Sequence, residues 1–363
     1  MLIVGNQYFS TDPPNIKANV ILDNITTKYP HISRDNLVKM LFDRLILVRI
    51  VHIASPMGSG KTSIMNLFAH HYSESVECLY HSLLNQTPQD ALEHAGVQPN
   101  GRLSITLKHK CDDHLVVIML DDCQKRYTKE YTNFWEYLIK NSNGFHENLT
   151  FIMCSTRSLI TAEDSPAVFT ELATLQRNDF LLTDDEALSL IRLEPPTGLA
   201  LSLRYDVVEA VMIKECNGLV AALRISITHL NKHFCDRNLV NEEEVLQAYF
   251  SAKLVPKLDR CFTYRGNIAG QFHQFLVGLM TRTTQLPVVE DDKELYERLV
   301  KCGVLAKFDG AVGFASPLAS RYITSVMFPD RCAPENSPKT LELLIVEAIK
   351  RMAANSLRRS IVI

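Results

Sequence analysis

The chain has 363 residues, of which 46% are hydrophobic and 22% are charged, and its formal net charge is -3. This length is enough for about two or three domains with a substantial core, and the composition is that of a globular protein. The small net charge gives no general case for nucleic-acid binding, and no apolar run approaches the roughly twenty residues that span a bilayer. We therefore expect no membrane partner.

The nine cysteines are spread singly along the chain and form no C-x-x-C pair. Several of them lie inside apolar runs, which favours reduced and buried thiols. The first residues also lack the basic segment and the long apolar segment of a secretory signal. These observations predict a cytoplasmic or nuclear protein.

Residues 1–44 are expected to form a proline-marked lead-in that ends in a helix near Asp35 to Arg44. The following region, 45–183, alternates short apolar runs with helical patterns. Helices are predicted at 62–72, 88–94 and 129–140, and strands at 45–53, 76–84, 103–107, 115–120, 149–154 and 179–182. Such alternation predicts an α/β fold with a parallel sheet covered on both faces.

Strands stop near residue 184, where Thr183 and Glu186 have the spacing of a capping box at the start of a helix. Helical periodicity in 203–234 and 241–254 predicts a helical lid over 184–256. Asp309 and Gly310 stand between two short apolar runs, a strong hairpin signal, and we predict a winged helix over 257–328. A linker at 329–338 is followed by an amphipathic helical tail, 339–363.

The most informative segment is 55–63, SPMGSGKTS, which lies between an apolar run and a helical pattern. Strand, glycine-rich turn, Lys-Thr and helix is the order of a phosphate-binding P-loop. We expect Lys61 to reach the β- and γ-phosphates of ATP and Thr62 to bind Mg²⁺. The predicted cofactor-binding positions in the loop are Ser55, Gly58, Ser59, Gly60, Lys61, Thr62 and Ser63.

Ser55 stands where the P-loop consensus has its first glycine. The alternative interpretation is a Gly/Ser turn that only caps a core helix. The flanking strand and helix favour nucleotide binding over this alternative.

Two acidic residues, Asp121 and Asp122, follow the apolar strand 115–120. Ligands of parallel sheets bind at the carboxyl ends of the strands, so Asp121 is predicted to hold the magnesium ion. Asp122 is predicted to orient the attacking water. Its side chain is one methylene shorter than the glutamate of many ATPases, so binding is predicted more strongly than hydrolysis. The alternative is a strand that simply ends in a polar turn.

Arg157 follows the predicted strand 149–154 and is the third catalytic candidate, because a cation there can stabilise charge on the γ-phosphate. A solvated arginine is the alternative. Gly218 lies between two predicted helices, where a glycine ends one helix before the next begins.

Together these segments resemble the STAND class of P-loop NTPases, which are related to the AAA+ group. Ser155-Thr156-Arg157 matches the strand tip of that class, and Cys216-Asn217-Gly218-Leu219 matches most of its lid motif. The resemblance implies that Gly218 belongs to the nucleotide site. Val220 stands in place of the motif's proline, and the Met-His-Asp triplet of the class is absent.

A closer resemblance links SPMGSGKTS, VGFASPLASRYI (312–323) and the segment 341–360 to the NTPase modules of Crinkler-type proteins. Members of that family are discussed as effectors that reach host nuclei, and their NTPase often precedes a restriction-nuclease-like domain. We expect this chain to lack the Crinkler header and the nuclease, and the tail 339–363 resembles the first helix of such a nuclease domain.

Three functional hypotheses stay open at this point. The chain is a magnesium-dependent, ATP-hydrolysing switch, or a nucleotide-binding interaction module without turnover that acts on a protein partner or as a homo-oligomer. The third hypothesis is a DNA-associated protein that uses its winged helix and the basic tail residues Lys350, Arg351, Arg358 and Arg359. The mildly acidic chain favours a solvated helix face over contact with nucleic acid.

Overall fold

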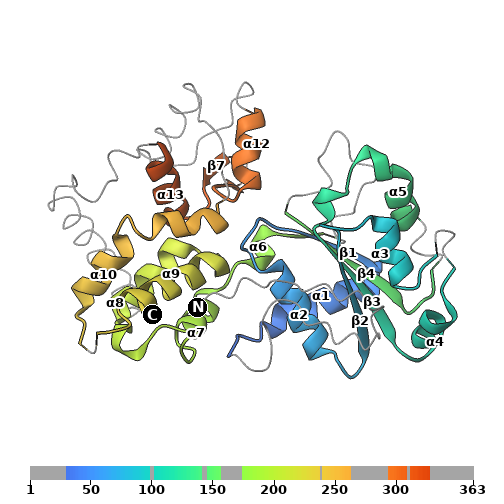
Figure 1. Ribbon diagram of the computed structural model, residues 1–363, viewed down its shortest axis with the longest axis horizontal. Helices are drawn as coiled ribbons and strands as arrows, with labels where there is room; N and C mark the ends of the chain where they lie inside the picture. The colour runs from blue at the N-terminus through green and yellow to red at the C-terminus, as the bar shows by residue number, and fades with distance from the viewer. Residues whose placement is uncertain are drawn as a thin grey trace, which may run out of the picture.

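The computed structural model describes residues 30–98, 102–140, 145–156, 174–237, 239–262, 293–308 and 311–327. Arg157, the turn residues Asp309 and Gly310, and the tail 339–363 lie outside the described residues. Figure 1 shows the sheet and its covering helices on one side of the molecule and a helical region on the other, with the short helix α6 between them.

A five-stranded parallel sheet forms the first region, in the order β2-β3-β4-β1-β5. The predicted α/β fold is thereby confirmed. Its strands are β1 (Ile50–Ala54), β2 (Val76–Ser82), β3 (Leu115–Asp121), β4 (Leu149–Ser155) and β5 (Thr174–Gln176). The helices of this region are α1 (Asp35–Val48), α2 (Lys61–His71), α3 (Pro88–His94), α4 (Ile105–Asp113), α5 (Thr132–Lys140) and α6 (Arg177–Phe180).

Both faces of the sheet are buried, and strand β3 shows why. Val117 and Met119 pack with residues of α1 and α2 on one face. Val116, Ile118 and Leu120 pack with residues of α3, α4 and α5 on the other. Because successive side chains of a strand point to opposite faces, an uninterrupted apolar run is what a strand buried on both sides requires.

Three strand predictions were wrong: those at 45–53 and 179–182 in position, and that at 103–107 in kind, because no strand forms there. Residues 45–48 continue helix α1, since Leu41 and Leu45 are buried one helical turn apart. The helix ends at Val48, before Arg49, whose φ is 58°. Residues 105–107 begin helix α4, because the Ser104 side chain caps it by accepting a hydrogen bond from the Leu107 N–H.

The strand predicted at 179–182 lies instead at 174–176, where it is β5. Gln176 and Asp179 form a capping box that starts helix α6. This local side-chain bonding ends the strand and turns the chain toward the helical region.

The helical region contains α7 (Asp184–Ile191), α8 (Asp206–Cys216), α9 (Val220–His233) and α10 (Glu242–Phe250), which we call the lid. The predicted capping box at Thr183 and Glu186 is confirmed. Short 3-10 helices lie at Cys123–Lys125, Lys129–Tyr131, Leu201–Leu203 and Val255–Arg260.

Residues 293–327, called here the C-terminal unit, contain α12 (Lys293–Lys301), β6 (Leu305–Phe308), β7 (Ala311–Phe314) and α13 (Pro317–Met327). The predicted pairing of the two short strands is confirmed, because β6 and β7 are antiparallel with Leu305 opposite Phe314. A single apolar cluster joins this unit to the lid, from Leu182 to Ile323. The winged helix over 257–328 stays a prediction.

The eight cysteines within the described residues are free thiols, and all of these except Cys235 are buried. Burial raises the pKa of Cys78 to about 12, which keeps this thiol protonated and unreactive. Of the helices in the described part of the chain, none has the length and apolarity to cross a membrane.

Candidate functional site

The glycine-rich loop joins the carboxyl end of β1 to the first turn of α2, which begins at Lys61. Gly58 has a φ of 76° and Gly60 a φ of 94°, a backbone region that favours glycine. The first N–H groups of α2 have no partner within the helix and carry its positive dipole end, so this junction suits an anion.

Lys61 folds back over the loop. Its Nζ donates hydrogen bonds to the Ser55 carbonyl at 2.7 Å and to the Pro56 carbonyl at 3.0 Å. Burial lowers the pKa of Lys61, and the nearby carboxylates of Asp121 and Asp122 act in the opposite direction. A largely desolvated ammonium with one further N–H to donate is a strong binding group for a polyphosphate.

Ser55 shows that serine fits in place of the consensus glycine. No positive φ occurs at Ser55, unlike at Gly58 and Gly60, so its backbone does not require a glycine. The side-chain hydroxyls of Ser55 and Ser59 are buried and have no hydrogen-bond partner among the described residues. Buried hydroxyls without a protein partner beside a phosphate loop fit the oxygens of a bound polyphosphate. Ser63 is exposed on α2.

Thr62 and Asp121 meet at the end of the sheet. The Thr62 hydroxyl donates to Asp121 Oδ2 at 2.8 Å, and the Tyr80 hydroxyl donates to the same oxygen at 3.3 Å. Burial raises the pKa of Asp121, although the bond from Thr62 and the charge of Lys61 favour its ionised form. A hydroxyl and a carboxylate oxygen this close suit Mg²⁺, which commonly takes one or two protein oxygens and completes its shell with phosphates and water.

No group of three or more His, Cys, Asp or Glu side chains in the described residues could hold a metal by itself. The oxygens of Thr62 and Asp121 fit a magnesium ion that takes its other ligands from phosphate and water.

Asp122 is held by two side chains. Its φ is 58°, and its Oδ1 accepts a hydrogen bond from Gln124 Nε2 at 3.1 Å while Oδ2 accepts one from Ser82 Oγ at 3.3 Å. The Gln124 amide oxygen in turn accepts from the Thr156 backbone N–H at 3.0 Å, at the end of β4. The candidate water-orienting acid is thus tied to the tips of the two neighbouring strands.

Sequence reasoning did not identify Ser82, Tyr80 or Gln124 as part of the site. For Ser82 a signal existed, because a polar residue ends the strand β2 that pairs with β3, and the parallel register sets Ser82 opposite Asp121. Nothing in the sequence pattern pointed to Gln124, whose role depends on the fold of the turn after β3.

The lid touches the loop directly. The Ala221 N–H, in the first turn of α9, donates to the Gly58 carbonyl at 3.1 Å. A Cβ on Gly58 would lie 2.9 Å from the Ala221 Cβ, and one on Gly60 would lie 3.2 Å from Val220 Cγ1. Because loop and lid share this contact, the position of α9 and the occupancy of the loop are expected to influence each other.

Gly218 precedes α9 and contacts a different segment. Its carbonyl accepts a hydrogen bond from the Leu182 N–H at 2.8 Å, and a Cβ on it would lie 2.7 Å from the Leu182 carbonyl oxygen. The residue thus fastens the lid to the connection between α6 and α7. Its role in nucleotide binding stays a prediction, as does that of Arg157.

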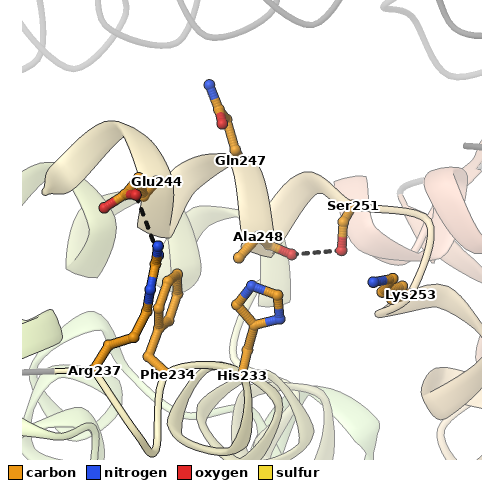
Figure 2. A pocket seen from close by; sticks show the side chains of 8 residues that line it. All are labelled: His233, Phe234, Arg237, Glu244, Gln247, Ala248, Ser251 and Lys253. Carbon is orange, nitrogen blue, oxygen red and sulfur yellow. Dashed lines mark hydrogen bonds and ion pairs between the residues drawn. The ribbon is translucent and has the colours of Figure 1, made fainter. Parts of the chain in front are cut away.

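A separate open hollow of about 280 Å³ lies on the lid, between the end of α9 and helix α10 (Figure 2). Arg237 in this hollow is paired with Glu244 at 3.1 Å, and His233 and Lys253 point into the same space. It contains no residue of the loop, of β3 or of α2, so it is distinct from the site described above.

No protein-family model and no curated protein matches the sequence of this chain. Among solved structures, the Walker-type ATPase PABY2304 of Pyrococcus abyssi is similar over 80% of this chain and 95% of its own, with a TM-score of 0.50 and 11% sequence identity. RuvB of Thermotoga maritima, a Holliday junction branch migration motor, matches over 80% of this chain and 94% of its own, with a TM-score of 0.40 and 15% identity. Cdc6p of Pyrobaculum aerophilum matches over 85% of this chain and 97% of its own, with a TM-score of 0.40 and 11% identity. The likeness to the first of these shows that the chain has the fold of a P-loop ATPase.

Proposed function

We propose that the protein binds Mg²⁺-ATP and hydrolyses it, and that the lid and the C-terminal unit respond to the bound nucleotide. The observation that carries this proposal is the convergence of three groups at one edge of the sheet. Lys61 is bonded over the loop, Thr62 is bonded to Asp121, and Asp122 is oriented by Ser82 and Gln124.

Each of these residues has a separate task. The loop N–H groups and Lys61 hold the polyphosphate and offset its charge. Thr62 and Asp121 would hold the magnesium ion, which when bound neutralises charge on the phosphate oxygens. Asp122 orients a water molecule and accepts its proton, and its bonds to Ser82 and Gln124 fix the direction in which its free lone pairs point.

Nucleotide binding and turnover by four proteins test this proposal. Lys61→Ala should weaken ATP binding by about 100-fold, because a desolvated charge-assisted contact is lost. Asp122→Asn should leave binding within about twofold and lower kcat by about 100-fold, since the oxygen that accepts the proton is removed. Lys39→Ala, an exposed lysine on α1, is the control and should resemble wild type. Equal ATP affinity in wild type and Lys61→Ala would refute nucleotide binding at the loop.

A second candidate function is nucleotide binding without turnover. The Asp122 geometry favours it, because both carboxylate oxygens already accept protein hydrogen bonds and the residue is held in the left-handed backbone region. In that case wild type and Asp122→Asn would bind ATP equally well, and neither would release phosphate.

We further propose that this is a STAND-type switch of the Crinkler kind, on the strength of the sequence segments that resemble those families. Of these segments, 55–63 forms the loop, Cys216–Leu219 lies at the junction of α8 and α9, and Phe314–Leu318 links β7 to α13. A switch of this class would change its assembly or its contacts with nucleotide. Size-exclusion chromatography with and without ATP tests that expectation, and an elution volume independent of nucleotide counts against an oligomeric switch.

A further inference from the structure

A second cation, Arg177, lies beside the loop. It follows strand β5 directly, and β5 pairs with β1 so that Gln176 stands opposite Ala54. Arg177 therefore begins its helix at the level of Ser55, the first residue of the loop. Like the loop, it lies at the carboxyl edge of the sheet, where folds of this type bind their ligands.

The Arg177 side chain is partly buried and has no carboxylate partner among the described residues. Burial lowers its pKa, and in this part of the chain its hydrogen-bond acceptor is the backbone carbonyl of Ala315, 3.3 Å from Nη2. By contrast, Arg34 and Arg321 are each paired with a glutamate. A partly buried cation that finds one backbone carbonyl as acceptor among the described residues is suited to an anionic ligand.

The carbonyl that Arg177 contacts is a junction of three parts of the protein. Asn217 Nδ2, at the end of lid helix α8, donates to the same Ala315 oxygen at 2.9 Å. The Ala315 N–H donates to the Val304 carbonyl at 2.9 Å. Gly303, the neighbour of Val304, lies against the loop, since a Cβ on it would be 3.4 Å from the Pro56 Cβ.

We propose that Arg177 is a phosphate-binding residue that exchanges the Ala315 carbonyl for the terminal phosphates of a nucleoside triphosphate. This inference rests on the proposed function. Lys61 Nζ is bonded to the carbonyls of Ser55 and Pro56, so the ammonium that meets the terminal phosphates lies at the same end of the loop as Arg177. A charged phosphate oxygen is a stronger acceptor for a guanidinium than a neutral carbonyl is.

The exchange would have a structural consequence. When Arg177 turns to phosphate, the Ala315 carbonyl loses its contact with the sheet region but keeps its bond from Asn217. The C-terminal unit then keeps its bond to the lid and loses one of its contacts with the sheet region, while Gly303 still lies against Pro56. A nucleoside diphosphate, which lacks the terminal phosphate, would leave the Arg177–Ala315 contact in place.

Arg34 offers a matched control for a binding experiment. It also joins the sheet region to the start of the lid, through the Phe180 carbonyl at 2.9 Å, the Leu181 carbonyl at 3.0 Å and Glu186 at 3.2 Å. Its guanidinium donates to Glu186 and to two backbone carbonyls, and none of these groups belongs to the loop. Removing it weakens the connection between the regions without removing a ligand for phosphate.

The test measures the affinities of wild type, Arg177→Ala, Arg177→Lys, Arg34→Ala and Lys61→Ala for a non-hydrolysable ATP analogue and for ADP. Arg177→Ala should lower the affinity for the triphosphate analogue by about 10- to 100-fold, which is the effect of losing one charge-assisted hydrogen-bonded pair. It should lower the affinity for ADP by less than about threefold. Arg177→Lys should recover part of the triphosphate affinity, and Arg34→Ala should change neither. Equal losses for both nucleotides, or losses in Arg177→Ala no larger than in Arg34→Ala, would overturn the inference.

Hydrogen exchange at residues 304–315 gives a readout that does not need turnover. In wild type the triphosphate analogue should speed exchange there and ADP should not, whereas Arg177→Ala should exchange fast without any nucleotide. Slow exchange in unliganded Arg177→Ala would contradict the proposal that this contact restrains the C-terminal unit. The two proposals can fail separately. If Lys61→Ala leaves the nucleotide affinity unchanged, the loop is not the nucleotide site. If the affinity falls in Lys61→Ala but not in Arg177→Ala, only the proposed role of Arg177 is rejected.

Discussion

The contact between Gly58 and Ala221 can be tested by a double-mutant cycle. Gly58→Ala places an L side chain at a φ of 76°, which costs about 1–2 kcal/mol of folding free energy. The added Cβ also lies 2.9 Å from the Ala221 Cβ, and relieving such overpacking costs about 1–3 kcal/mol more. We therefore expect Gly58→Ala to lower the free energy of unfolding by about 2–5 kcal/mol, by the sum of these two costs.

Ala221→Gly removes the atom that Gly58→Ala would meet, and alone it should cost about 0.5–1 kcal/mol for a glycine in a helix. In the double variant the overpacking disappears while the backbone strain remains. The coupling free energy between the two sites should thus be about 1–3 kcal/mol in the favourable direction.

Urea unfolding of wild type, both single variants and the double variant measures this coupling directly. Ala222→Gly combined with Gly58→Ala provides the control cycle, since Ala222 is a buried residue of the same helix and contributes none of the three atoms nearest to a Cβ on Gly58. A coupling below about 0.5 kcal/mol, or one of equal size in the control cycle, would refute direct packing of the lid on the loop.

Three further predictions concern single side chains. Burial lowers the pKa of His52 to about 3 from an ordinary 6.5, so its stabilising effect is complete above pH 6.5 and is lost as the pH falls toward 3. His52→Gln should flatten the dependence of unfolding free energy on pH by up to about 1.4 kcal/mol per unit in that window, measured by urea unfolding at several pH values. Arg321→Met should destabilise by about 1–3 kcal/mol, because Glu215 loses its cation and the Tyr249 carbonyl loses a donor, and adding Glu215→Gln should restore part of the loss in thermal or urea unfolding. Thr62→Val should leave metal-free ATP binding unchanged but remove its enhancement by Mg²⁺, which titration calorimetry with and without the ion would show.

Much of the sheet region followed from local pattern. The run from Leu115 to Leu120 is apolar without interruption and forms a strand buried on both faces. Asp121 and Asp122 follow it at the edge of the sheet where ligands are expected to bind. Residues 88–94 form a helix with the predicted bounds because Thr87 and Asp90 cap it. Capping and periodicity involve residues within one or two turns of each other, so sequence alone reveals them.

The bounds of helices and strands were predicted less well where one apolar stretch contains parts of two elements. Leu45 to Val48 and Ile50 to Ala54 form a single hydrophobic run, yet the first part is helix and the second is strand. Burial of Leu45 with Leu41 on one helix face decides this division, and it depends on the sheet that the helix covers. Hydrophobicity alone does not tell a buried helix end from a buried strand.

The sequence by itself determined the chemistry of the loop. Gly58, Gly60, Lys61 and Thr62 are fixed at spacings that make a phosphate-binding turn between a strand and a helix, and the contacts that create the turn are local. Only the tertiary structure decided what surrounds that turn. Gln124, Ala221 and Arg177 come from segments far apart in the chain, and they meet the site because parallel strands bring their carboxyl ends to one edge and the lid folds back onto it.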